Sequence, residues 1–149
     1  MGKPAVSAGG GGAAPGHAVL PSPAVGVRRS ANLGSVQSDT PSEVSATQAL
    51  ELMRSEAILL DVREDHEWAA GHAPDATHIP MSRISQHARN LPADKTIICV
   101  CHVGARSAAV AAALNRAGWT AHNLSGGMEA WAAAGLPVVD YMGGAGVVI

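Results

Sequence analysis

The sequence predicts an α/β fold built on a parallel sheet. Short apolar runs typical of buried strands alternate with helical segments, and Gly or Pro follows most of them. The strongest strand signal covers residues 96–100 and the strongest helix signal covers residues 106–117, where Ala-rich sequence ends at Gly118. Strands that alternate with helices of this length are typical of parallel sheets with helices on both faces. We therefore expect a three-layer α/β domain.

The remaining elements follow from local start and stop signals. A helix is predicted where a capping residue precedes a helical period, and a strand where an apolar run stands between turn residues. In chain order they are a helix capped by Ser45 that reaches residue 53, a strand over 57–60, a short helix over 64–70 closed by Gly71, a strand over 77–79 stopped by Pro80, a helix capped by Ser82 that reaches Leu91, a strand over 121–124, and a helix over 128–134 ended by Gly135.

The two ends of the chain lack these patterns. Residues 1–40 are rich in Gly and Pro and show no sustained period, so they are expected to form a flexible tail. The folded domain is expected over residues 41–140. Residues 141–149 hold three glycines around a short apolar end, and this C-terminal tail either docks loosely or frays.

Composition and charge exclude several classes of function. The chain has 149 residues, enough for one hydrophobic core, and a net charge of −2, which is not the basic excess of a nucleic-acid-binding protein. No apolar stretch approaches the roughly 20 residues that a membrane helix needs. Arg28 and Arg29 lack the apolar segment that would follow them in a twin-arginine export signal. We therefore expect neither a nucleic-acid partner nor a membrane span.

The chain has two cysteines, Cys99 and Cys101, separated by one residue. This spacing is no disulfide framework for a secreted fold, so a cytoplasmic location is expected. Cys99 lies within the predicted strand over 96–100, where a buried packing role is favoured. The alternative is a resolving thiol that forms a local disulfide with Cys101.

Cys101 stands where a parallel sheet places its functional groups. Ligands bind beyond the carboxyl ends of parallel strands, and residues 101–107 join the central strand directly to the Ala-rich helix. Gly104 permits a positive φ, so the backbone N–H groups of this short loop can converge on an anion at the positive end of the helix. These donors are expected to lower the pKa of the Cys101 thiol and make it a nucleophile. Arg106 adds a charged hydrogen-bonding fork if it turns inward.

Four motifs in order resemble those of the rhodanese-like domain family. The first is Cys-x-x-Gly-x-Arg-Ser from Cys101 to Ser107, which resembles the family's active-site loop. The others are Asp61-Val62-Arg63-Glu64 with Glu67-Trp68 and Gly71-His72-Ala73-Pro74, then His78-Ile79-Pro80, then Leu124-Ser125-Gly126-Gly127-Met128-Glu129-Ala130-Trp131 with Gly135-Leu136-Pro137. The resemblance covers about residues 42 to 139.

The resemblance implies a rhodanese-like three-layer domain with a five-stranded parallel sheet, and a sulfurtransferase. Cys101 would take the sulfane sulfur of a donor such as thiosulfate, hold it as a persulfide, and pass it to cyanide, a thiol or a protein acceptor. No metal or organic cofactor is implied. Arg63 matches a position that can contact an anionic substrate. The expected substrate-binding residues are Arg63, His102, Val103, Gly104, Ala105 and Arg106.

Two positions depart from the family pattern. His102 follows the nucleophile where the family often has Arg, and Val103 replaces a residue that is frequently polar. These changes make the loop less positive, so thiosulfate is not necessarily the preferred donor.

Other readings of the motifs remain open. Asp61 and Glu64 are favoured as structural residues over a general acid/base pair, and His66, His72 and His78 match no compact zinc spacing. Rhodanese-fold arsenate reductases and phosphatases use a longer Cys-x5-Arg loop, whereas here four residues separate Cys101 from Arg106. A rhodanese module that carries sulfur between proteins, or binds a protein with little small-donor activity, is the other alternative.

Overall fold

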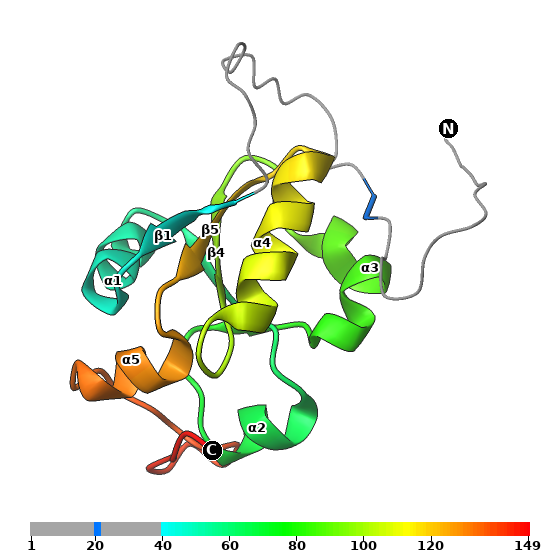
Figure 1. Ribbon diagram of the computed structural model, residues 1–149. Coiled ribbons are helices and arrows are strands. Elements are labelled where there is room, and N and C mark those ends of the chain that lie inside the picture. Colours follow the sequence, from blue (N-terminus) through cyan, green and yellow to red (C-terminus); the bar gives the residue numbers. More distant parts are fainter. Residues whose placement is uncertain (1–19, 22–39) are drawn as a thin grey trace.

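A computed structural model describes residues 20–21 and 40–149 and contains a five-stranded, all-parallel sheet (Figure 1). The strand order is β1-β5-β4-β2-β3, so β4 lies at the centre. The strands are β1 (Ser42–Val44), β2 (Ile58–Asp61), β3 (Thr77–His78), β4 (Thr96–Val100) and β5 (Thr120–Leu124). The predicted α/β class and five-stranded parallel sheet are confirmed.

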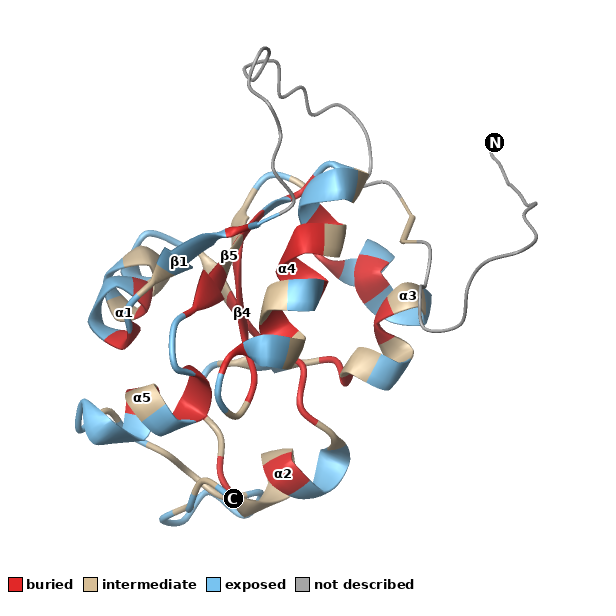
Figure 2. Ribbon diagram, in the orientation of Figure 1, coloured by how far each residue is buried: buried red, intermediate tan, exposed pale blue. Residues whose placement is uncertain are grey.

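Helices cover both faces of this sheet. The helical elements are α1 (Ala46–Arg54), α2 (Asp65–Ala70), η3 (Met81–Arg83), α3 (Ile84–His87), η4 (Ala88–Asn90), α4 (Ala105–Ala117) and α5 (Gly127–Ala133). One buried cluster joins α3 and α4 to strand residues that include Leu60, Cys99 and Cys101, and the other joins α1 and α5 to the opposite face through Leu59 and Val100. Figure 2 shows the buried residues concentrated along β4, β5 and the sheet side of α4.

The parallel strands place the expected ligand-binding end of the fold. Side chains of successive strand residues point to opposite faces, and β2 and β4 pair with Asp61 level with Val100. The loop after β4, the N-terminal ends of α4 and α5, and helix α2 all lie at the carboxyl end of the sheet (Figure 1). This is the end at which ligands bind in parallel α/β folds.

Local signals explain most element boundaries. Ser45 caps α1, because its Oγ accepts the N–H of Gln48 at 3.1 Å while Gln48 Oε1 accepts the N–H of Ser45 at 2.8 Å. Gly118 ends α4 with a φ of 112°. The short edge strand β1 follows no pattern in its own three residues and exists through its pairing with β5.

The helix predicted from Ser82 to Leu91 is wrong in detail. The structure has one 3-10 turn before the four-residue α3 and one after it, and Ser82 lies inside the first turn. Its hydroxyl donates to Glu64 Oε1 at 3.0 Å, so it is bound to another segment rather than capping its own helix. A tertiary contact therefore overrides the local capping preference.

The C-terminal segment docks on the domain. The N–H groups of Tyr141 and Val147 donate to the carbonyls of Ala69 and Ala70 at 3.1 and 2.9 Å. A Cβ on Gly71 would overlap the Val147 backbone, so the close approach of this segment requires glycine there. Residues 141–149 thus cover the end of α2.

Most of the N-terminal segment lies outside the described residues, including Arg28 and Arg29. Leu20 is described, and it packs against the cluster formed with α3 and α4. Within residues 20–21 and 40–149, no helix has the length and apolar character needed to cross a membrane.

Candidate functional site

The loop between β4 and α4 wraps its backbone around the sulfur of Cys101. The N–H groups of Gly104 and Ser107 donate to Sγ at 3.1 and 3.3 Å, and the Ser107 hydroxyl lies 3.3 Å from it. Gly104 has a φ of 114°, which turns the chain back toward the sulfur before α4 begins at Ala105. We call this ring of donors the cradle. Its backbone N–H groups converge as the sequence predicts, and the binding of an anion by residues 101–107 stays a prediction.

The cradle stabilises a thiolate. Burial raises the pKa of Cys101, but hydrogen bonds from the Ser107 hydroxyl and from the backbone N–H groups of Ser107, Gly104 and Arg106 outweigh it. The net result is a pKa below the ordinary value of the thiol. Cys101 is only 1% exposed, so a sulfur donor has to bring its sulfur into the ring of donors.

Cys99 has the opposite environment. Its side chain is fully buried in the strand, and burial raises the pKa of its thiol well above the ordinary value. A thiol held in its neutral form is a poor nucleophile. The packing role predicted for Cys99 agrees with this placement, whereas the resolving-thiol alternative finds no support in it.

Helix α5, which follows β5, is hydrogen-bonded to the loop that forms the cradle. The N–H groups of Met128 and Glu129 donate to the carbonyls of Cys101 and His102 at 2.7 and 3.1 Å. Gly127 has a φ of 63°, and a Cβ there would overlap both carbonyl oxygens. The Gly-Gly of the last sequence motif is therefore what allows the N-terminus of α5 to contact the active-site loop.

His102 and Val103 do not line the cradle with their side chains. His102 Nε2 lies 3.0 Å from Glu129 Oε2 on α5, so its ring faces that carboxylate. The Val103 side chain is 54% exposed at the tip of the loop. Gly104 thus acts on the sulfur through its backbone, and the His102 side chain is paired with Glu129 on α5.

The Arg106 side chain is also ion-paired with a carboxylate. Its guanidinium makes a two-pronged ion pair with Glu67 on α2, with N–O distances of 2.9 and 2.8 Å. This hydrogen bonding lowers the pKa of Glu67 to about 2 and raises the pKa of Arg106. The guanidinium does not point into the cradle, so the inward-turned fork expected from the sequence is absent from this structure. Its backbone N–H still acts on the sulfur.

Arg63 is held by Asp61 and Gly71. Its side chain is fully buried against Asp61, with Nη2 donating to Asp61 Oδ2 at 2.8 Å and to the Gly71 carbonyl at 2.7 Å. Among the described residues its Nη1 is buried and has no hydrogen-bond partner. The contact of Arg63 with an anionic substrate therefore stays a prediction. The structural role predicted for Asp61 is confirmed, since Asp61 Oδ1 also accepts the backbone N–H of Arg63 at 3.0 Å.

Sequence reasoning assigned no role to several residues around the cradle. Ser107 and Glu67 stand inside the recognised motifs, but their contacts cross between α4, α2 and the loop. Asn123 is a polar residue in the middle of a strand and only 3% exposed. A buried polar side chain requires hydrogen-bond partners, but β5 contains three polar residues, so its sequence does not indicate that Asn123 is buried.

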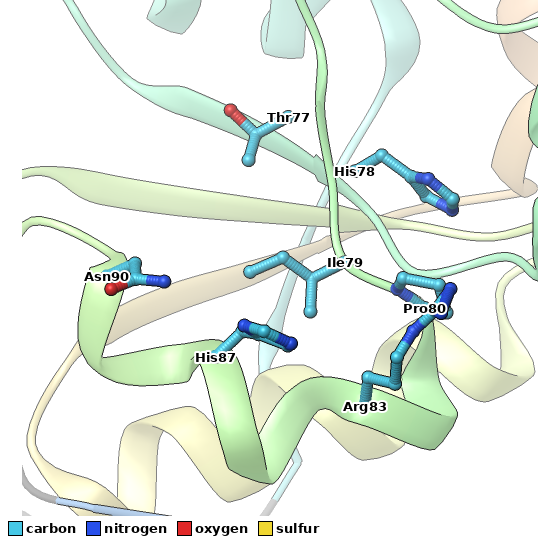
Figure 3. A pocket seen from close by; sticks show the side chains of 7 residues that line it. All are labelled: Thr77, His78, Ile79, Pro80, Arg83, His87 and Asn90. Carbon is cyan, nitrogen blue, oxygen red and sulfur yellow. The ribbon is translucent and has the colours of Figure 1, made fainter.

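His72 and a groove beside β3 lie outside the cradle. His72 Nδ1 lies 2.7 Å from the Trp68 carbonyl, so the ring is bound to the backbone of α2. Among residues 20–21 and 40–149, no three His, Cys, Asp or Glu side chains form a group that could hold a metal ion. A groove of about 440 Å³ between β3 and the helical turns after it contains neither cysteine (Figure 3). Its lining residues are Thr77, His78, Ile79, Pro80, Arg83, His87 and Asn90.

Comparison with known proteins agrees with this geometry. The family described as "Rhodanese-like domain" matches residues 45–134. A putative sulfurtransferase of Bacillus subtilis, YtwF, is 42% identical over 76 residues, which are 51% of this chain and 74% of that protein. A thiosulfate sulfurtransferase of Pseudomonas entomophila, GlpE, is 34% identical over 89 residues, which are 59% of this chain and 82% of that protein.

Solved structures resemble the fold as well. The crystal structure of a rhodanese-related protein from Thermoplasma volcanium superposes with a TM-score of 0.62 at 31% identity. The match covers 66% of this chain and 97% of that one.

The contact between α5 and the loop predicts the effect of Gly127→Ala. The added Cβ overlaps the carbonyl oxygens of Cys101 and His102 at a positive φ, so the free energy of unfolding should fall by about 2–4 kcal/mol. Gly135→Ala is the matched control, because Gly135 also has a positive φ but no atom lies near its Cβ position. It should cost about 1–2 kcal/mol. Urea unfolding measures both, and equal losses would contradict the steric argument.

The cradle predicts a reactive Cys101 at neutral pH. In a Cys99→Ser background, the rate of alkylation by iodoacetamide should rise with pH with a midpoint below about 8.5. Ser107→Ala removes the hydroxyl donor and should move that midpoint up by about one pH unit. A midpoint that stays in place would show that the hydroxyl does not act on the thiolate.

The ion pair between Glu67 and Arg106 predicts a pH dependence of stability. The pKa of Glu67 is lower in the folded protein than in the unfolded chain, so protonation favours unfolding. The stability that the pair contributes should be present above about pH 4.5 and lost as the pH falls toward about 2. Urea unfolding at pH 7, 4.5 and 3 should show a steeper loss for the wild type than for Glu67→Gln. Parallel curves would mean that the pair does not stabilise the fold.

Proposed function

The chain belongs to the rhodanese-like domain family, and we propose that it is a sulfurtransferase in which Cys101 carries the transferred sulfur as a persulfide. The observation that carries the proposal is the set of three hydrogen-bond donors on Cys101 Sγ. All three donors favour a thiolate before the reaction, and the two backbone N–H donors favour an anionic sulfur after it. The sulfurtransferases among the relatives support the same chemistry.

In the first half-reaction the Cys101 thiolate attacks the sulfane sulfur of a donor such as thiosulfate. An S–S bond forms at Sγ, the S–S bond of thiosulfate breaks, and sulfite leaves with the electron pair. The negative charge of the thiolate passes to the outer sulfur of the persulfide. The N-terminal end of α4, whose first residues are Ala105 and Arg106, provides a positive potential for that charge.

In the second half-reaction an acceptor removes the outer sulfur. Cyanide or a thiolate attacks it, the persulfide S–S bond breaks, and the electron pair returns to Cys101 Sγ as thiolate. With cyanide the product is thiocyanate. The cycle consumes no net electrons and needs no metal or organic cofactor. Cys101 has to be a free thiol at the start, which fits the cytoplasmic location expected from the sequence.

The charges around the loop indicate how a sulfur donor is bound. The side chains of His102 and Arg106 face Glu129 and Glu67, so little uncompensated positive charge remains at the mouth of the cradle. Binding of the loop to an anionic donor then depends on the backbone donors of Gly104, Arg106 and Ser107. We propose that the loop residues bind the donor through their backbone, and that Arg63 contributes by holding Asp61 and Gly71 in place.

This pairing of charges favours a second candidate function, the relay of sulfur between proteins. A protein donor or acceptor does not depend on capture by a cationic loop, because its own surface contacts supply the affinity. The exposed Val103 at the tip of the loop is available for such a contact. Efficient turnover with thiosulfate and cyanide would favour the small-molecule enzyme, and saturable exchange with a protein persulfide alone would favour the relay.

The persulfide mechanism predicts a specific mass change. After brief treatment with thiosulfate or with 3-mercaptopyruvate, intact-mass spectrometry should show a gain of about one sulfur atom. Cyanide should discharge this gain. It should be absent in Cys101→Ser and present in Cys99→Ser, which is the matched control because both changes replace one thiol by one hydroxyl.

The same experiment separates the two candidates. A gain of mass that depends on Cys101 with a small donor supports the sulfurtransferase with small substrates. No such gain with either donor would overturn that reading and leave the relay, which loading from a protein persulfide would then test.

A further inference from the structure

A buried polar chain runs from Cys101 to the edge of the sheet. The Ser107 hydroxyl lies 3.3 Å from Cys101 Sγ and 2.6 Å from Asn123 Oδ1. Asn123 Nδ2 lies 3.1 and 3.2 Å from the two carboxylate oxygens of Glu43 on β1. Ser107 is fully buried and Asn123 is 3% exposed, so bulk water does not compete for these groups.

The orientation of the Asn123 amide is determined by its other partners. The Gly104 carbonyl, 3.2 Å from Nδ2, and the Glu43 carboxylate both accept hydrogen bonds, so the amide nitrogen has to face them. The amide oxygen therefore faces Ser107. Asn123 thus offers Ser107 an acceptor and no donor.

The Ser107 hydroxyl has one proton and two acceptors. A hydrogen bond to an anion is roughly twice as strong as one between neutral groups, so a thiolate at Cys101 attracts the proton. A neutral sulfur at Sγ is a weak acceptor, and then the short contact with Asn123 Oδ1 is the better one. The hydroxyl can satisfy either demand by rotation about its C–O bond, without transfer of the proton.

We propose that Asn123 is a positioning residue for sulfur transfer, which gives the Ser107 hydroxyl an alternative acceptor whenever Cys101 Sγ is not an anion. Asn123 does not touch the sulfur and acts through Ser107. The proposal rests on the proposed function for its role in the catalytic cycle. The sharing of one proton between Cys101 and Asn123 stands on the geometry alone.

Asn123 therefore stabilises the persulfide state of Cys101 relative to the thiolate state. In the resting thiolate, Ser107 donates to Sγ. When the donor's sulfur bonds to Sγ and the leaving group departs, the negative charge moves to the outer sulfur and Sγ becomes neutral. The hydroxyl then turns to Asn123, so no buried donor is left unpaired in the persulfide. Loss of this acceptor should lower the ratio of persulfide to thiolate by about fivefold, the effect of one neutral hydrogen bond.

Asn123→Leu and Ser107→Ala leave the charged groups near the chain unchanged. Glu43 lies behind Asn123, and Arg106 with its partner Glu67 lies on the α2 side of the loop. Asn123→Leu has a similar size and removes the amide without changing the charge. Its effect on Cys101 can therefore be attributed to the lost hydrogen bonds.

The test is a double-mutant cycle with Asn123→Leu and Ser107→Ala, read from the thiol pKa of Cys101 in a Cys99→Ser background. In Asn123→Leu the Ser107 hydroxyl loses Asn123 Oδ1 and keeps Sγ as its acceptor in this chain. Its hydrogen bond then favours the thiolate more than in the parent, so the pH midpoint of Cys101 alkylation should fall. In the Ser107→Ala background this fall should be absent, because the proton that is shared has been removed. We expect the midpoint shift caused by Asn123→Leu to differ by about half a pH unit or more between the background with Ser107 and the Ser107→Ala background. Persulfide loading from thiosulfate should fall about fivefold in Asn123→Leu alone.

Equal shifts in the two backgrounds would overturn the proposal, because Asn123 would then act by anchoring Gly104 rather than through Ser107. Glu43→Ala is a second route if Asn123→Leu does not fold, since Glu43 is exposed on the edge strand. Its carboxylate polarises the amide, so the same cycle should give a smaller difference of the same sign. A parent protein that forms no persulfide but shows the pKa pattern would overturn the proposed function and support the shared proton.

Discussion

The contact between the N-terminus of α5 and the carbonyls of Cys101 and His102 is the constraint on which the site depends. The cradle works only if several backbone N–H groups point at one sulfur, so the carbonyls of the same peptide chain must find partners elsewhere. Met128 and Glu129 supply these partners at 2.7 and 3.1 Å. Because Gly127 has no side chain, the helix reaches the loop and keeps the donors turned inward.

The chemistry of the cradle relies on oriented dipoles more than on charged side chains. The cations of the loop are each paired with a carboxylate from a neighbouring helix, Arg106 with Glu67 and His102 with Glu129. These pairs fasten α2 and α5 to the loop while the sulfur receives backbone N–H groups and one hydroxyl. A preorganised ring of this kind stabilises an anion without reorganising during the reaction. Rigidity and reactivity thus come from the same contacts.

Patterns within short segments were enough to predict much of the fold. The apolar run of β4, the Ala-rich α4 that ends at Gly118, and the N-cap at Ser45 agree with the structure because their causes lie within a few residues. Elements whose existence depends on distant partners were not predictable in this way. Strand β1 exists through pairing with β5, and Ser82 is drawn to Glu64 instead of capping a helix. The docking of residues 141–149 depends on the same kind of long-range contact.

By itself the sequence determined the fold class and the glycines that the backbone requires, and it pointed to Cys101 as the proposed nucleophile, because a strand followed directly by a Gly-containing turn and a helix puts a cysteine at the carboxyl end of the sheet. Only the tertiary structure decided which side chains face the sulfur. It placed Arg63 against Asp61, Arg106 against Glu67 and His102 against Glu129, and it brought Asn123 on β5 next to Ser107 on α4. The reason is physical: a charged or polar side chain takes the partner that folding brings within about 3 Å, and these partners come from other elements of the chain.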